Sequence, residues 1–150
     1  MIGSANLLPL RRRAFMGAIG IALVATTVGA CSNARNLTGQ PWQLVAITEK
    51  VPAFQGVIPA ADQSKYAITF NTDGTFNATA DCNQVSGSYK TSGSNGLTIT
   101  PGASTMAFCG EASFGTQFVE GLSKAASYTV SGNDLTLTLA DGGTMTFVAA

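Results

Sequence analysis

Residues 66–80 read YAITFNTDGTFNATA, and this stretch decides the fold class. On either side of the central Asn71-Thr72-Asp73-Gly74, apolar side chains alternate with small or polar ones. A period of two places successive side chains on opposite faces of a β-strand. An Asp-Gly pair between two such runs favours a tight turn. The stretch therefore predicts an antiparallel hairpin with one buried face.

The same alternation recurs along most of the chain. About eight such runs can be recognised, at 42–46, 66–70, 76–80, 87–90, 97–100, 127–130, 135–139 and 144–147. Turn-forming residues at 92–96 and 141–143 join two further hairpins. Antiparallel strands in this number curl into a barrel or a strongly bent sheet, because closure removes exposed edges.

One segment has a helical period instead. Between residues 111 and 125, Phe114, Phe118 and Leu122 recur every four positions, on one face of an α-helix. We expect this face to pack against the sheet; a functional groove is the alternative. Residues 49–64 contain prolines and no clear period, so we expect a surface loop there. The predicted fold class is α+β, mainly β: an antiparallel strongly curved sheet or small barrel with one covering helix.

Composition narrows the function classes. The 150 residues suit one domain, and the formal net charge of zero gives no electrostatic reason to expect a nucleic-acid partner. The chain has no histidine, which excludes a Ser-His-Asp triad, a Cys-His dyad and a His-bearing zinc site. The acids Asp81, Glu111, Glu120 and Asp134 show no spacing that pairs two of them. We therefore expect no catalytic residues, no metal and no cofactor.

Residues 1–30 have the plan of a secretory signal. Arginines at 11–13 precede 17 uncharged, mostly apolar residues, and Val28-Gly29-Ala30-Cys31 resembles the bacterial lipobox. That resemblance implies cleavage before Cys31 and attachment of lipid to it. The arginines also resemble a twin-arginine export signal, with an ordinary basic region as the alternative. An uncleaved membrane anchor is a further alternative, although the run is short for one.

Cleavage before Cys31 would leave a lipidated tether at 31–40 and a domain at 41–150. This mature chain has five basic and eight acidic residues, a net charge of −3. We expect it at a bacterial cell envelope, anchored by lipid on the outer face of a membrane and facing the periplasm or the outer membrane. Its remaining cysteines, Cys82 and Cys109, are expected to form a disulfide outside the cytoplasm. Two buried thiols or a two-cysteine metal site are the alternatives.

Several segments carry a family resemblance. They are LTGQPWQL at 37–44, YAITF at 66–70, DCN at 81–83, GSY at 87–89, TMAFC at 105–109 and FVEGL at 118–122. In order and spacing these segments resemble the META domain family, to which the heat-shock protein HslJ belongs. The resemblance implies a compact antiparallel sheet or barrel with a helix, often on an envelope lipoprotein. It implies links to stress and drug tolerance without a defined enzymatic chemistry.

The motif positions have a structural interpretation. Asn83 can cap a turn through its side chain, and Gly87 permits close backbone approach in a strand. Tyr89 and Trp42 supply large buried area with a polar group. The family pattern often has a proline after the second cysteine, where this chain has Gly110, so the local turn can differ.

Two binding functions follow from this sequence. The first is non-catalytic binding of an envelope protein, related to stress or to support of the envelope. The alternative is a small apolar-ligand module that uses the barrel mouth and the helix. Its candidate lining residues are Phe108, Phe114, Phe118 and Tyr128, which could equally fill the core.

Overall fold

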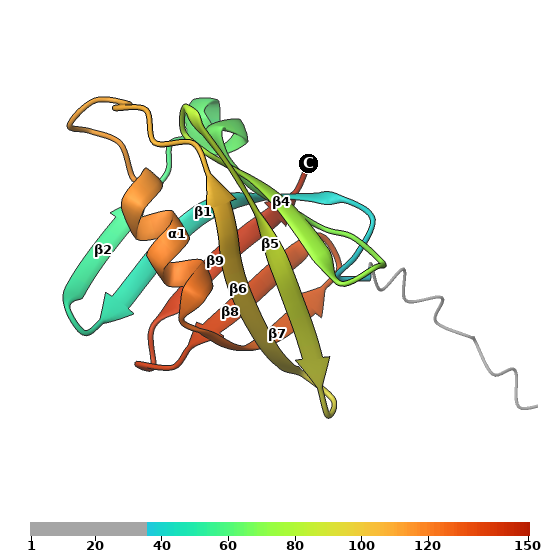
Figure 1. Ribbon diagram of the computed structural model, residues 1–150. Helices are drawn as coiled ribbons and strands as arrows, with labels where there is room; N and C mark the ends of the chain where they lie inside the picture. Colours follow the sequence, from blue (N-terminus) through green and yellow to red (C-terminus); the bar gives the residue numbers. More distant parts are fainter. Residues whose placement is uncertain (1–35) are drawn as a thin grey trace, which may run out of the picture. The chain divides into compact units, whose positions relative to one another are not determined.

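The computed structural model describes residues 36–150 (Figure 1). The predicted signal peptide and the predicted lipidation site, Cys31, lie outside the described residues. The described part contains nine strands, one α-helix and one 3₁₀ helix: β1 Pro41–Lys50, β2 Ala53–Val57, η1 Ala60–Lys65, β3 Tyr66–Phe70, β4 Thr75–Ala80, β5 Asn83–Ser92, β6 Gly96–Ser104, α1 Gly115–Ser123, β7 Ala125–Ser131, β8 Asp134–Leu139 and β9 Thr144–Ala149.

Eight of these strands close into an antiparallel barrel. The order runs β1-β3-β4-β5-β6-β7-β8-β9, and β9 pairs back with β1. The hairpin predicted at 66–80 is present as β3 and β4, with Phe70 opposite Phe76 and Ile68 opposite Ala78. These four side chains are buried. The prediction of a mainly β fold with a curved antiparallel sheet or small barrel is confirmed.

A bulge in β1 changes which of its side chains face inward. Leu44 pairs with Phe147 and Ala46 pairs with Thr146, so Val45 is one residue extra. An inserted residue reverses the alternation beyond it. The buried residues of β1 are therefore Trp42 and Leu44 before the bulge, and Ile47 and Glu49 after it. An unbroken alternation over the run predicted at 42–46 would place Ala46 on the same face as Trp42 and Leu44, but Ala46 is only half-buried. The sequence pattern did not show the bulge.

The prediction of a surface loop at residues 49–64 is wrong, because this segment contains β2 and most of η1. The first residues of β1 pair with β3 along one edge, and residues 46–50 pair with β2 along that same edge. The backbone of β1 there supplies hydrogen-bond partners to any extended neighbour, whatever its side-chain period. Pro52 and Pro59 stand outside β2 and bound it, so they do not interrupt the ladder.

The barrel is closed weakly between β6 and β7. In the described part of the chain, these strands pair at Gly96 and Ser127, and α1 lies against the rest of β6 (Figure 1). The helix buries Phe118 and Leu122 completely, so its apolar face packs on the core as expected. A Cβ on Gly121 would lie 2.8 Å from Met145 Sδ, so this glycine allows the close approach of helix and sheet.

Side chains fill the barrel. Trp42 is fully buried, and its Nε1 donates a hydrogen bond to Leu37 O at 2.8 Å. The other large aromatic side chains with almost no exposed surface are Phe70, Phe76, Phe118 and Phe147. The interior is thus a packed core, and a ligand has to bind at the surface or at one end.

One end of the barrel is held by a polar cluster. Asp141, in the turn between β8 and β9, accepts hydrogen bonds from the backbone N–H groups of Lys50, Val51 and Gly143 at 2.9, 3.0 and 2.8 Å. Beside it, Lys124 Nζ lies 2.8 Å from Glu49 Oε1. Two turns and the end of α1 are joined here. These hydrogen bonds hold the pKa of Asp141 below its usual value of 3.8, and the bond from the N–H of Val51 has the largest effect.

Phe118→Ala should lower the free energy of unfolding by about 3–5 kcal/mol, because it removes a fully buried ring from the core. Phe108→Ala is the matched control, since 84% of that residue is exposed, and it should change stability by less than about 0.5 kcal/mol. Urea denaturation of both variants measures the difference. Similar small losses would contradict the core position of Phe118.

Asp141→Asn should remove part of the acid sensitivity of the fold. A carboxylate with a lowered pKa contributes stability that is present above its unfolded-state pKa and is lost as the pH falls through the folded-state value. We expect the variant to be less stable than wild type at neutral pH and to approach it between about pH 5 and pH 2. Thermal denaturation across this range measures the effect. Asp134→Asn, which changes an exposed carboxylate, is the matched control. Its stability should change with pH in the same way as that of wild type.

Candidate functional site

A surface pocket of about 740 Å³ lies between α1, the start of β5 and residues 105–114, the pocket loop, which joins β6 to α1. Residues of the loop form one wall, and Thr116, Gln117, Val119 and Glu120 of α1 form the other. The volume falls within the range of roughly 300–1,000 Å³ that small-molecule sites occupy.

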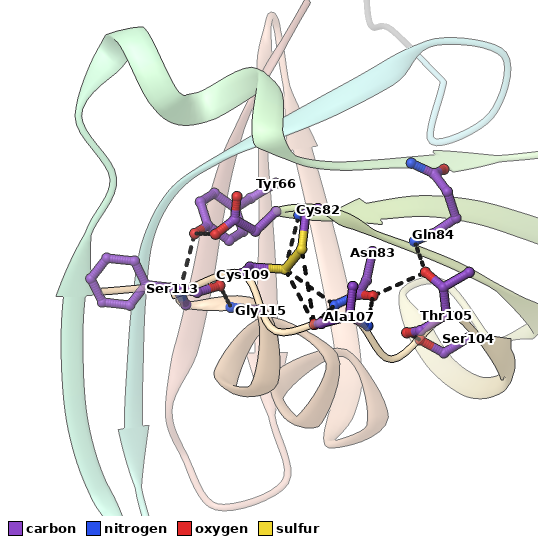
Figure 2. The surroundings of a disulfide bond; sticks show 12 residues. Tyr66, Cys82, Asn83, Gln84, Ser104, Thr105, Ala107, Cys109, Ser113 and Gly115 are labelled. Atoms are coloured by element: carbon purple, nitrogen blue, oxygen red, sulfur yellow. Dashed lines mark hydrogen bonds between the residues drawn. A yellow bond between two sulfur atoms is a disulfide. The ribbon is translucent and has the colours of Figure 1, made fainter. Parts of the chain in front are cut away.

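Asn83 fixes the middle of the pocket loop (Figure 2). Its Nδ2 donates to Ala107 O at 2.9 Å, and Ala107 N donates to its Oδ1 at 2.7 Å. The hydroxyl of Thr105 also donates to Oδ1, at 3.0 Å, and accepts from Gln84 N at 2.9 Å. The side chain was expected to cap a turn. It instead satisfies backbone groups of a residue 24 positions away, in the same manner as a neighbouring strand.

A disulfide reinforces this attachment. Cys82 and Cys109 are bonded across a sequence separation of 27, and Cys82 N donates to Cys109 Sγ at 3.2 Å. On the loop-entropy model, closing a loop of this length constrains the unfolded chain by about 3–4 kcal/mol. The bond also connects the turn between β4 and β5 directly to the pocket loop (Figure 2).

The second end of the pocket loop is held by Tyr66. Its buried hydroxyl accepts from Phe114 N at 3.1 Å and donates to Asp81 Oδ2 at 3.2 Å. Ser113 Oγ accepts from Gly115 N, at 3.1 Å, where α1 begins. Gly110 has φ +98°, a conformation that proline cannot adopt. The turn after Cys109 therefore differs from one that a proline in this position would make.

Between these attachments, two large apolar side chains project into solvent. Met106 is 94% exposed and Phe108 is 84% exposed. Both residues line the pocket. The backbone on each side of Ala107 is fixed by Asn83 and the disulfide, so the loop presents these side chains from a defined position.

The charge of the pocket is negative. Glu111 from the pocket loop and Glu120 from α1 line it, and none of the lining residues is lysine or arginine. The side-chain oxygen Gln117 Oε1 lies in the wall formed by α1. It is buried and has no hydrogen-bond donor among the residues described here.

The four aromatic residues proposed as ligand-lining do not share one pocket. Phe108 lines the pocket described above, whereas Phe118 is in the core. Phe114 lies at the loop end, with ring centroids 6.0 Å from Phe54 and 6.2 Å from Tyr66, and lines a smaller hollow of about 320 Å³. Tyr128 is a half-buried residue of β7. The helical period alone could not separate the ring in the core from the ring near the surface.

Sequence reasoning did not place Met106, Glu111, Gln117 and Glu120 around a common site. The only signal was indirect, since Cys109 lies in the loop that carries the first two residues. Which residues face each other across the pocket depends on how α1 crosses the barrel.

The remaining motif positions support the fold. A Cβ on Gly87 would collide with Thr100 O and would lie 2.7 Å from a ring carbon of Phe76. Tyr89 packs edge-on against Phe70, and its hydroxyl donates to Asn71 O at 2.6 Å. Gly87, Tyr89 and Trp42 do not line the pocket.

Residues 36–150 contain no recognisable metal-binding cluster and no helix suited to span a membrane. No group of three or more histidine, cysteine, aspartate or glutamate residues in this range is arranged to hold a metal ion. In the same range, no helix combines the length and the apolar character needed to cross a membrane.

Asn83→Ala should release the pocket loop without unfolding the barrel. Loss of the side chain leaves the N–H and C=O of Ala107 without their partners, which costs about 1–3 kcal/mol where water does not replace them. Hydrogen exchange should quicken at residues 105–109 and stay slow in β3 and β4. Asn83→Asp is the matched control, since it keeps the acceptor and loses the donor, and it should give an intermediate effect. Unchanged exchange at Ala107 in the alanine variant would contradict the assignment.

The model of the META domain family matches residues 35–150. No curated protein sequence matches the chain significantly.

Solved structures are similar in fold. A crystal structure of a DUF4847 family protein from Bacteroides vulgatus has 17% identity and a TM-score of 0.59, covering 75% of this chain and 93% of that one. An NMR structure of a protein from Burkholderia xenovorans has 23% identity and a TM-score of 0.61, covering 76% and 83%. At these identities the likeness concerns the fold alone. The family match covers well over half of the sequence, so the chain belongs to the META domain family.

Proposed function

We propose that this protein is a non-catalytic envelope lipoprotein that binds a partner protein through its pocket loop, in a role related to stress or to support of the envelope. The observation that carries the proposal is the exposure of Met106 and Phe108 on a loop held by a disulfide and by Asn83. The sequence features at residues 1–31 and the family membership support the envelope context.

The fixed loop favours binding for a physical reason. A flexible loop loses conformational entropy when a partner orders it, and this loss weakens association. Here the backbone next to both side chains is already held in place. Burial of Met106 and Phe108 would then contribute roughly 1.5–3 kcal/mol each, which is typical of the few residues that dominate an interface.

The absence of catalysis is also part of the proposal. The chain lacks histidine, and the carboxylates at the pocket, Glu111 and Glu120, come from two different elements. We assign them to the electrostatics of binding.

A small ligand in the pocket is the second candidate function. It is favoured by the pocket volume of about 740 Å³ and by the combination of apolar and polar residues that line it. Met106 and Phe108 would then cover the ligand in place of contacting a protein.

A photo-crosslinking amino acid at Phe108 should give one discrete adduct with a partner in intact cells, because this side chain is at the centre of the proposed contact. The same amino acid at Val57, which is 66% exposed on β2, is the matched control and should not give that adduct. Met106→Ser should weaken the Phe108 adduct while the protein remains folded. Equal crosslinking from both positions would contradict partner binding through the loop.

The same experiment includes an arm for anchoring. Cys31→Ser removes the expected site of lipid attachment, so the protein should leave the membrane fraction and its adduct should decrease. Protein that stays in the membrane after this change would contradict lipid anchoring at Cys31. Absence of any adduct from the membrane-bound protein that carries the crosslinking amino acid at position 108 and an intact Cys31 would favour the small-ligand candidate.

A further inference from the structure

We infer that Cys82 Sγ is a site of exchange with a small thiol, and that Cys109 is the sulfur that leaves. This inference goes beyond the proposed function and does not depend on it. The thiolate of the small molecule attacks Cys82 Sγ, the bond to Cys109 Sγ breaks, and Cys109 keeps the electron pair as a thiolate. The products are a mixed disulfide at Cys82 and a free thiolate at Cys109, so the exchange needs no further oxidant or reductant.

The two sulfurs differ in their hydrogen-bond donors. Cys109 Sγ accepts from the backbone N–H of Cys82 and from Nδ2 of Asn83, both at 3.2 Å (Figure 2). Among the described residues, no N–H group donates to Cys82 Sγ, which lies 3.9 Å from Ala107 O. Cys109 Sγ lies 3.6 Å from the same oxygen, so this carbonyl opposes a thiolate on either sulfur.

The donors act on the charge that develops during exchange. Hydrogen bonds to a charged acceptor are stronger than those to a neutral one, so the N–H groups stabilise a thiolate more than the intact disulfide. A more stable thiolate is also the faster leaving group. Both donors point to Cys109, and attack is therefore directed to Cys82.

The position of Cys82 permits this attack. Cys82 is an exposed residue in the turn between β4 and β5, whereas Cys109 is half-buried. Cys109 lines the pocket, so a small thiol can approach it as well. Access therefore allows attack on either sulfur, and the N–H donors decide between the two.

The nearby charges do not provide a similar distinction. Asp81 directly precedes one cysteine and Glu111 closely follows the other, so each sulfur has one acid as a neighbour in sequence. Lys65 and Asp62 line the smaller hollow beside the disulfide, but they are paired with each other at 2.8 Å.

The pocket loop favours closure of the bond once the small thiol is removed. The hydrogen bonds of Asn83 with Ala107, at 2.9 and 2.7 Å, and the contact of Tyr66 with the end of the loop do not involve the disulfide. These contacts keep Cys109 close to Cys82. Its thiolate then attacks the mixed disulfide intramolecularly and expels the small thiol as a thiolate.

The test treats the full lipid-anchored protein in detergent with 2-mercaptoethanol. Exchange is stopped with acid at early times, and pepsin digests the protein in acid, where thiolates are absent and the adducts do not rearrange. Mass spectrometry of the peptides measures the adduct on Cys82 and on Cys109. We expect about ten- to hundredfold more adduct on Cys82, because both donors stabilise the charge on the leaving sulfur.

Asn83→Ala removes one of the two donors and should lower this ratio about three- to tenfold. Thr105→Ala is the matched control. The Thr105 hydroxyl bonds to Asn83 Oδ1 and to Gln84 N, so its loss also weakens the attachment of the loop but leaves both donors to Cys109 Sγ in place. This variant should keep the wild-type ratio.

Closure is measured by removing 2-mercaptoethanol at neutral pH. The adduct on Cys82 should disappear from wild type as the disulfide forms again. Cys109→Ser carrying the same adduct is the control and should retain it. An adduct that persists equally in both proteins would contradict attack by Cys109.

The direction of exchange can be overturned in three further ways. Equal adduct on the two cysteines, or more on Cys109, would contradict attack at Cys82. An unchanged ratio in Asn83→Ala would contradict the role of its amide. If the folded protein forms neither adduct nor free thiols while the urea-unfolded protein is reduced, Cys82 is closed to thiols and the inference fails. Binding through the pocket loop is judged separately, by the crosslinking experiment.

Discussion

β1 forms backbone hydrogen bonds with β9 along one edge and with β3 and then β2 along the other, which turns a single sheet into a barrel. The pairing with β9 joins the two ends of the domain and places Trp42 and Leu44 beside the inward-facing Phe147. Closure leaves no room between the strands for a ligand, because the side chains directed inward fill the space. A ligand or partner would therefore have to bind at the surface or at one end of the barrel.

The weak junction between β6 and β7 explains where the proposed binding surface lies. Where these strands separate, the chain inserts α1, which covers the core with Phe118 and Leu122. The connection from β6 to this helix has to pass over the outside of the barrel. The resulting loop runs from the end of β6 to the start of α1 (Figure 1). The pocket is lined by residues of this loop and of α1.

If the pocket loop made no contacts with the barrel, it would be free to move in this position. The disulfide, the amide of Asn83 and the hydroxyl of Tyr66 hold it at three places (Figure 2). All three contacts use residues at the ends of β3, β4 and β5, so the rigid part of the sheet defines the position of Met106 and Phe108. The motif residues Cys82, Asn83 and Cys109 thus act on the proposed binding surface through the loop, although none of them needs to touch a partner.

The sequence by itself determined the hairpins, the single helix and the apolar positions of most strands, because these depend on local periods and on turn residues such as Asp73-Gly74. The tertiary structure alone decided the bulge at Val45, the strand β2 and the arrangement of the pocket. A bulge and an added strand depend on the hydrogen-bond groups that a neighbouring strand offers, and no local pattern encodes those. The grouping of Phe108, Glu111 and Glu120 likewise depends on the path of α1 across the barrel, which is set by packing against residues far apart in the sequence, Ile47 and Met145 among them.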